Sequence, residues 1–218
     1  MRTVFWILGL ILLPLGPSQA GAAEPAAAYY PLQPGMTWEY GVVSSKAGAG
    51  KIAVKNLPPR EIDGKMVTPR EWSMGGTVRY YLVARDDFGV YRYGELASEN
   101  AEPTVITPKV YYLREPVDKG TTWDIVTKMG DRELKVNLTV ESAAEEVKVP
   151  AGTFKDCVKI RHEGTGRSAK DGETTAITAY EWYAPGAGLV KSLATIKEKS
   201  KTGEASETLT YQLDSLKP

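Results

Sequence analysis

Cysteine and histidine are almost absent from this 218-residue sequence, which contains one of each, Cys157 and His162. A single cysteine excludes an intramolecular disulfide and a lipid-modified cysteine next to an N-terminal signal. A single histidine excludes a multi-histidine zinc or iron centre. We therefore expect a protein that is stabilised by its packed core and that carries no metal and no other cofactor.

An excess of one charge sign is also missing, since lysine plus arginine and aspartate plus glutamate each number 27. Such a balanced chain has no field of one sign to attract nucleic acid or an anionic membrane surface. With 42% hydrophobic and 25% charged residues, the composition is that of an ordinary globular protein. Nucleic acid is therefore not an expected partner, and the envelope ligand or protein that the chain binds is not identified by its charge.

The first 20 residues are typical of a secretory signal peptide, with Arg2 followed by an apolar run over 4–15 and small residues up to Ala20. Cleavage is expected after Ala20, and sites as late as residue 23 fit the same rule. The apolar run is shorter than the roughly 20 residues that span a bilayer, so no transmembrane helix is expected after cleavage. The mature chain is predicted to be periplasmic or extracellular and not a lipoprotein.

Helical periodicity is missing after this segment, and apolar and polar residues alternate from residue 29 onward. Between 132 and 141, Leu134, Val136 and Leu138 fall on one face, with polar residues on the other. Because no helix is available to cover the apolar faces, these faces must pack against each other. The sequence predicts an all-β antiparallel meander, folded as a two-sheet sandwich or a curved open barrel.

Turn signals divide this pattern into strands. Asp-Gly pairs at 63–64 and 171–172 are predicted to form two-residue hairpin turns, because aspartate and glycine tolerate the positive φ values that such turns need. After residue 152, the pattern predicts a meander of four long strands, near 154–166, 174–184, 188–199 and 205–215.

One motif occurs twice. Residues 31–38 and 116–123 share Pro, Gly, Thr and Trp at equal spacing, 85 positions apart. The match indicates either duplication of a half-domain or two uses of one device for starting a strand. We interpret residues 29–218 as a single domain with two duplicated halves, 29–108 and 109–218, preceded by a flexible linker over 21–28.

Three motifs carry a family resemblance: the repeated motif, VPAGTF at 149–154 with Cys157 and Ile160 behind it, and WYAPGAGLVK at 182–191. In this order they resemble a group of exported bacterial proteins, some carried under the name TapB-like, over residues 29–215. The resemblance implies a signal peptide and a β-rich envelope domain, and it assigns no catalytic residue. Some members are distantly similar to lipoprotein-carrier folds, in which a curved sheet holds acyl chains against helices, and this sequence lacks those helices.

Aromatic residues near strand ends are the candidate ligand-binding residues, because aromatic platforms bind sugars, lipids and peptides. The alternative is that they pack in the core, where aromatic residues are common. His162 is added because it alternates in phase with Val158 and Ile160, which places it toward the apolar face. The six candidate residues are Trp38, Tyr80, Trp123, His162, Trp182 and Tyr183.

Cys157 has two interpretations. Lys155, Lys159 and Arg161 would lower the pKa of its thiol if they shared its strand face. The other interpretation is a small, inert and partly buried thiol.

Catalytic motifs are missing from the sequence, which has no Gly-x-Ser-x-Gly nucleophile turn and no complete phosphate-binding loop around 48–51. We therefore predict a non-catalytic periplasmic or secreted protein that binds a hydrophobic or polymeric envelope ligand, or a partner protein, on its sheet. One alternative is a carboxylate-based hydrolase, in which two acidic side chains meet in a cleft. The other alternative is an outer-membrane β-barrel, since alternating faces also suit strands between lipid and water.

Overall fold

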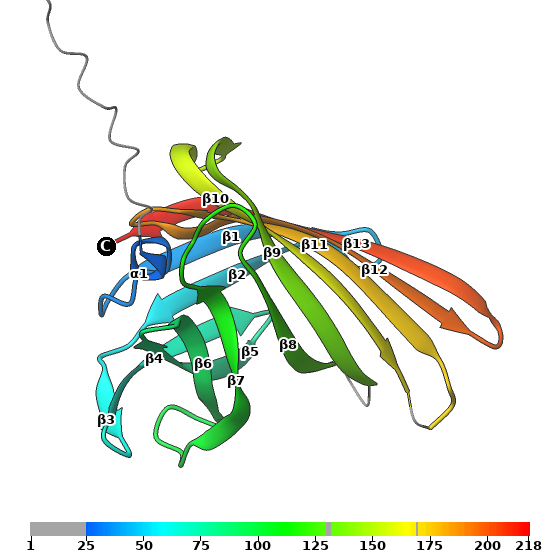
Figure 1. Ribbon diagram of the computed structural model, residues 1–218, viewed down its shortest axis with the longest axis horizontal. Coiled ribbons are helices and arrows are strands. Elements are labelled where there is room, and N and C mark those ends of the chain that lie inside the picture. The colour runs from blue at the N-terminus through cyan, green and yellow to red at the C-terminus, as the bar shows by residue number, and fades with distance from the viewer. Residues whose placement is uncertain (1–24, 130–131, 169) are drawn as a thin grey trace, which may run out of the picture.

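The computed structural model describes residues 25–129, 132–168 and 170–218, so the predicted signal peptide lies outside the described residues. The chain forms one antiparallel sheet that curls into a nearly closed barrel (Figure 1). The predicted all-β antiparallel meander is therefore confirmed. Of the two predicted arrangements, the sheet adopts the curved open barrel. The elements are α1 (Ala26–Tyr29), β1 (Thr37–Ser44), β2 (Gly48–Asn56), β3 (Arg60–Ile62), β4 (Lys65–Met74), β5 (Thr77–Asp86), β6 (Gly89–Leu96), β7 (Thr104–Arg114), β8 (Thr122–Met129), β9 (Arg132–Val149), β10 (Gly152–Arg167), β11 (Thr174–Ala184), β12 (Gly188–Ser200) and β13 (Gly203–Lys217).

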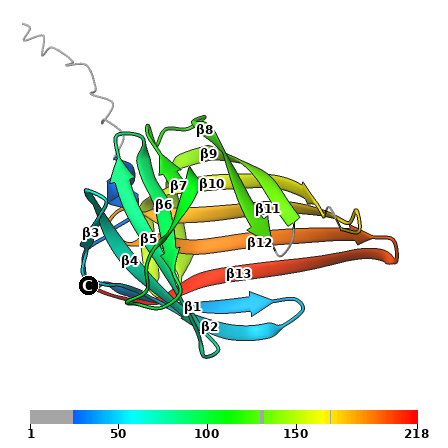
Figure 2. The ribbon, with the colours of Figure 1, turned by 90° about the horizontal axis from the view of Figure 1, so that it is seen from below.

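Two meanders build the sheet, in the order β7-β6-β5-β4-β2-β1 and then β13-β12-β11-β10-β9-β8, with β3 paired to β4 alone. They join where β1 pairs with β13, and Val42 lies opposite Tyr211 in that pair. Strands β10–β13 extend well beyond the shorter strands β4–β7 (Figure 2). The four long strands predicted after residue 152 are therefore confirmed as β10 to β13.

The two edge strands of the sheet, β7 and β8, follow one another in the chain and leave a seam in the barrel wall. Across this seam the indole N–H of Trp123 on β8 donates a hydrogen bond to the backbone oxygen of Tyr111 on β7, at 3.1 Å. Trp123 is buried at this position. The side chain of Trp123 thus bridges the two edge strands, which no backbone ladder joins among the described residues.

The apolar side of the alternating pattern forms the inner wall. Leu134, Val136 and Leu138 on β9 are all buried, as the sequence predicts. They share one core cluster with residues of β5, β6 and β7, such as Val83 and Leu113. The concave face of one meander therefore packs against the concave face of the other, without an intervening helix.

Both copies of the repeated motif have the same local structure. Gly35 and Gly120 adopt positive φ values of 88° and 96°, which glycine adopts without steric strain. Gly35 N–H donates to Asn56 O, and Gly120 N–H donates in the same way to Val140 O, on the strand that pairs with the one about to begin. The motif is thus a device that starts β1 and β8 with a buried tryptophan, while duplication of the halves stays a prediction.

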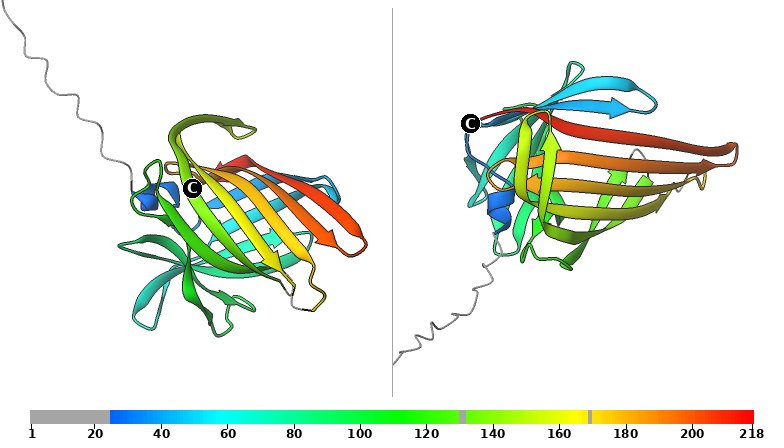
Figure 3. Two further views of the ribbon diagram at one scale, coloured as in Figure 1. Left: turned by 45° about the vertical axis from the view of Figure 1, so that its right-hand side comes forward. Right: turned by 90° about the horizontal axis from the view of Figure 1, so that it is seen from above.

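The N-terminal segment closes one end of the barrel. Helix α1 lies at the end opposite the tips of the β10–β11 and β12–β13 hairpins (Figures 1 and 3). Ala26 is buried, and Gly186 N–H donates to Ala28 O at 2.8 Å. Residues 25–28, which the sequence pattern assigns to the flexible linker, are thus held against the barrel. In the described part of the chain, no helix has the length and apolar character needed to cross a bilayer.

The two predicted Asp-Gly turns differ. The turn at 63–64 is confirmed, since Ile62 pairs with Lys65 and both turn residues have positive φ. The prediction at 171–172 is wrong, because the strands pair only as far as Arg167 and Thr174 and leave the longer loop 168–173 between them. Ser168 N–H donates to Glu173 O, and Gly172 N–H donates to Ser168 O, so the glycine lies within this loop and does not form a two-residue turn.

Replacing Trp123 by Phe tests whether the seam depends on the indole. We expect the Trp123→Phe change to lower the free energy of unfolding by about 1 kcal/mol or more, because the bond to Tyr111 O is lost in a buried place. Trp72→Phe is the matched control, since Trp72 lines the barrel interior but its indole has no hydrogen bond among the described residues. Equal losses for both variants in urea denaturation would contradict a specific role of the seam bond.

Candidate functional site

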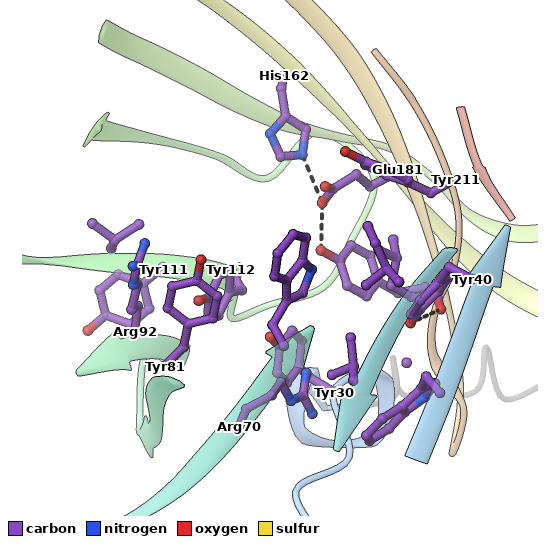
Figure 4. Close-up of a pocket in the computed structure, with 18 of the residues that line it drawn as sticks. Tyr30, Tyr40, Arg70, Tyr81, Arg92, Tyr111, Tyr112, His162, Glu181 and Tyr211 are labelled. Carbon is purple, nitrogen blue, oxygen red and sulfur yellow. Dashed lines mark hydrogen bonds and ion pairs between the residues drawn. The ribbon is translucent and has the colours of Figure 1, made fainter. Parts of the chain in front are cut away.

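A cavity of about 390 Å³ lies inside the curled sheet, between the two meanders and the N-terminal segment (Figure 4). Most of its wall is aromatic or aliphatic. The aromatic lining residues are Tyr30, Trp38, Tyr40, Trp72, Tyr81, Tyr111, Tyr112, Tyr183 and Tyr211. The charged or ionisable groups besides tyrosine are Arg70, Arg92, His162 and Glu181.

The alternation of the strands places these side chains. On β11, Glu181 and Tyr183 face the cavity, whereas Trp182 between them points to the other face of the sheet. On β4, Arg70 and Trp72 share the inward phase in the same way. Charged side chains therefore point into the interior from the same strand faces as the aromatic side chains that line it.

Glu181 is the centre of a polar group within this wall. His162 Nε2 lies 3.3 Å from Glu181 Oε2, and the Tyr183 hydroxyl donates to the same oxygen at 2.5 Å (Figure 4). The side chains of His162 and Glu181 are mostly buried and keep 17% and 25% of their exposure.

The pKa of Glu181 reflects two opposing effects. Burial raises it, but the charge of His162 and the hydrogen bonds from His162 and Tyr183 outweigh burial and hold the pKa below its ordinary value. Burial and the adjacent Glu181 carboxylate raise the pKa of Tyr183 well above the ordinary value. Tyr183 is therefore a neutral donor to an ionised carboxylate at neutral pH.

Arg70 joins the barrel wall to the N-terminal segment. Its Nε donates to Asn56 Oδ1 at 2.8 Å, and its Nη2 donates to Pro31 O at 2.9 Å. The guanidinium lies over the rings of Tyr30 and Trp38, at 4.4 Å and 4.8 Å from their centroids. Both rings line the cavity, so the cation is positioned at its wall.

Arg92 is the second guanidinium of the cavity. It lies 4.2 Å from the ring centroid of Tyr81, and its Nη2 forms an ion pair with Glu95 at 2.7 Å. Its Nε is buried without a hydrogen-bond partner among the described residues. The charge of Arg92 is thus compensated by a carboxylate outside the cavity lining.

The other tyrosines supply neutral hydroxyl groups. Burial is the main cause that raises the pKa of Tyr30, Tyr40 and Tyr112 above the ordinary value. Tyr40 already donates to Leu189 O at 2.9 Å. The wall therefore combines apolar rings with a few polar atoms, which is the usual make-up of a small-molecule site.

Three of the six candidate residues, Trp38, His162 and Tyr183, line this cavity. The other three do not line it. Tyr80 packs beside the cluster of β4, β5 and β6 residues, and Trp123 is the seam residue. Trp182 donates to Glu145 Oε2 at 2.7 Å on the opposite face of the sheet. A role of any of them in ligand binding stays a prediction.

The sequence predictions missed Arg70, Arg92 and Glu181. A usable signal existed for two of them, because Arg70 is in phase with Trp72 and Glu181 with Tyr183, and each pair faces inward. A charged residue that is in phase with a large aromatic residue on a strand is therefore a candidate residue for the site. Arg92 lies beside a β-bulge between β6 and β7, where the simple alternation fails.

Cys157 is buried in the second core cluster. Burial, with the nearby Asp156 and Glu145 carboxylates, raises the pKa of its thiol to about 11. The hypothesis that neighbouring basic residues lower this pKa is therefore wrong, since Lys159 instead pairs with Glu141. The inert, buried thiol is the interpretation that holds.

Comparisons with known proteins assign no function to this chain. A family model described as DUF3108-like matches residues 119–206. No curated protein matches the sequence. A candidate lipoprotein from Parabacteroides distasonis ATCC 8503 is 17% identical, with a TM-score of 0.47, over 87% of this chain and 98% of that one. A candidate exported protein with a YmcC-like fold from Bacteroides fragilis NCTC 9343 is 16% identical, with the same TM-score and coverage.

The depressed pKa of Glu181 predicts a pH-dependent contribution to stability. Its ionised form is favoured in the folded state, so this contribution is present above the ordinary glutamate pKa of about 4.3 and is lost as pH falls through the lower folded value. We expect the Glu181→Gln variant to be less stable than wild type at neutral pH, with a difference that shrinks under acid. Denaturation at a series of pH values checks this, and a difference independent of pH would contradict it.

Proposed function

We propose that this chain is a non-catalytic binding protein of the cell envelope, which holds a hydrophobic ligand in the cavity of its curled sheet. The observation that carries the proposal is a cavity of about 390 Å³ whose wall is mostly aromatic and aliphatic. Ligand cavities of this size and composition bury most of a small ligand and remove its apolar surface from water.

The shape of the barrel supports a small ligand over a polymer or a partner protein. Helix α1 and the residues after it close one end, where Gly186 N–H is bonded to Ala28 O. A polymer that threads through the barrel would need both ends open. The cavity also lies on the concave side, which a flat protein surface does not reach.

The composition of the wall favours binding over hydrolysis. A carboxylate-based hydrolase uses two acidic side chains that face one bond. Among the described residues that line the cavity, Glu181 is the one carboxylate, and His162 and Tyr183 already engage it. The arrangement suits the recognition of a polar group on a ligand.

A periplasmic or extracellular location is part of the proposal. It is supported by the N-terminal sequence, with its charged start, apolar run and small residues up to Ala20. The relation to the TapB-like group stays a prediction.

Filling the cavity tests the proposal. Ile125 lines it, whereas the next residue, Val126, is 38% exposed, so Ile125→Trp and Val126→Trp form a matched pair. We expect wild type to bind the neutral dye Nile red, Ile125→Trp to bind it about tenfold more weakly, and Val126→Trp to bind it as wild type does. Dye fluorescence gives the affinities, and circular dichroism confirms that both variants fold. No binding by wild type, or equal binding by all three proteins, would overturn the proposal.

A further inference from the structure

Arg70 is a cation without a carboxylate partner. Its guanidinium donates hydrogen bonds to a side-chain amide oxygen of Asn56 and a backbone oxygen of Pro31, and it lies over the rings of Tyr30 and Trp38. Among the described residues, no carboxylate lies within ion-pair distance of it. A half-buried guanidinium that has no carboxylate partner is stabilised when an anion binds to it.

The other charged groups of the cavity are already paired. Arg92 forms its ion pair with Glu95, and Glu181 is held by His162 and Tyr183. Two guanidinium groups and one carboxylate line the cavity, and Glu95, outside the lining, compensates the guanidinium of Arg92. Among the described residues, Arg70 is therefore the cation of the cavity that has no carboxylate partner.

A second arginine adds to the positive region at the closed end. Arg85 donates through Nη2 to Tyr30 O at 3.0 Å, so it holds the same N-terminal segment as Arg70. Burial and then the charge of Arg70 lower the pKa of Arg85, which shows that the two cations repel each other. An anion bound at Arg70 would relieve this repulsion.

The wall becomes apolar with distance from Arg70. In the pairing of β2 with β4, Arg70 lies opposite Asn56 and Trp72 lies opposite Val54. Ile52 lies two residues farther along β2, opposite Met74. Trp72, Val54 and Ile52 all line the cavity. This direction leads away from the segment around Pro31 and toward the tip of the β1–β2 hairpin. The wall formed by β2 and β4 is therefore cationic near the N-terminal segment and apolar toward the hairpin tip.

We infer that the ligand is a single-chain amphiphile, with an anionic head group that binds Arg70 at the closed end and an apolar chain that lies along the wall toward the open end. The inference rests on the proposed function and adds the class and the orientation of the ligand. A carboxylate and a phosphate both match a guanidinium through paired N–H groups. The head group enters first, and the tail lies nearest to solvent.

A matched pair of fluorescent ligands tests the inference with the wild-type protein alone. The probes are 11-(dansylamino)undecanoic acid and its methyl ester, which share the same chain and differ in the charge of one end. We expect the acid to bind about tenfold more tightly or better at neutral pH, since a charge-assisted bond forms only with the acid. Equal affinities would overturn the anionic head group and leave the hydrophobic site intact.

Two arginine variants test the position of the head group. Arg70→Gln is expected to abolish the preference for the acid, so that acid and ester bind alike. Arg85→Gln is the matched control, because it also removes a bond to the N-terminal segment but changes no cavity-lining residue. Because Arg85 adds to the positive field but does not line the cavity, Arg85→Gln is expected to lower the preference for the acid only partly, whereas Arg70→Gln removes it. Because the readout is a ratio within one variant, a general loss of stability does not produce the predicted pattern. Retention of the preference in Arg70→Gln would overturn the assignment to this residue.

Competition between ligands distinguishes a carboxylate head group from a phosphate head group. Laurate and dodecyl phosphate are each titrated against the bound dansyl acid, and displacement by either one supports the inference, with the stronger competitor identifying the head group. Binding of Nile red without binding of the dansyl acid overturns the inference but leaves the proposed function standing. Failure of Nile red and both dansyl probes overturns the two together.

Discussion

The structure depends on one constraint: the sheet has a continuous apolar face, and the described part of the chain contains no helix long enough to cover it. Burial of that face can then come only from the sheet itself, so the two meanders curl until their concave sides meet. The β1–β13 pair joins them on one side, and Trp123 bridges the open seam on the other. The N-terminal segment closes one end of the barrel. The interior stays open along the seam and at the opposite end, near the tips of the long hairpins.

The same constraint explains why a cavity remains. The inward positions carry tryptophan and tyrosine side chains with polar tips, together with Arg70, Arg92 and Glu181. The charged groups among them need water or a partner when they are buried. An interior built only to be stable would hold leucine and valine, as β9 does at Leu134 and Val136. The aromatic and charged lining is the feature that supports the proposed binding function.

Much of the architecture is predictable because period-two alternation is a local property. The inward face of β9 and the inward direction of His162 follow from counting residues along a strand. The joint between the meanders is not predictable in this way, since it pairs Val42 with Tyr211 across the whole chain. Arg70 meets Pro31 and Tyr30 only after that closure, so its role is a property of the fold. The buried helix α1 is also determined by the barrel end that it contacts, and its short alanine-rich sequence resembles a linker.

The most direct test of this account is a crystal structure of the protein grown with decanoate. The account predicts an elongated ligand on the concave side of the sheet, with its carboxylate within hydrogen-bond distance of the Arg70 guanidinium and its chain directed along Trp72 and Ile52. An interior filled by the protein's own side chains, or decanoate bound only on the convex face, would contradict it.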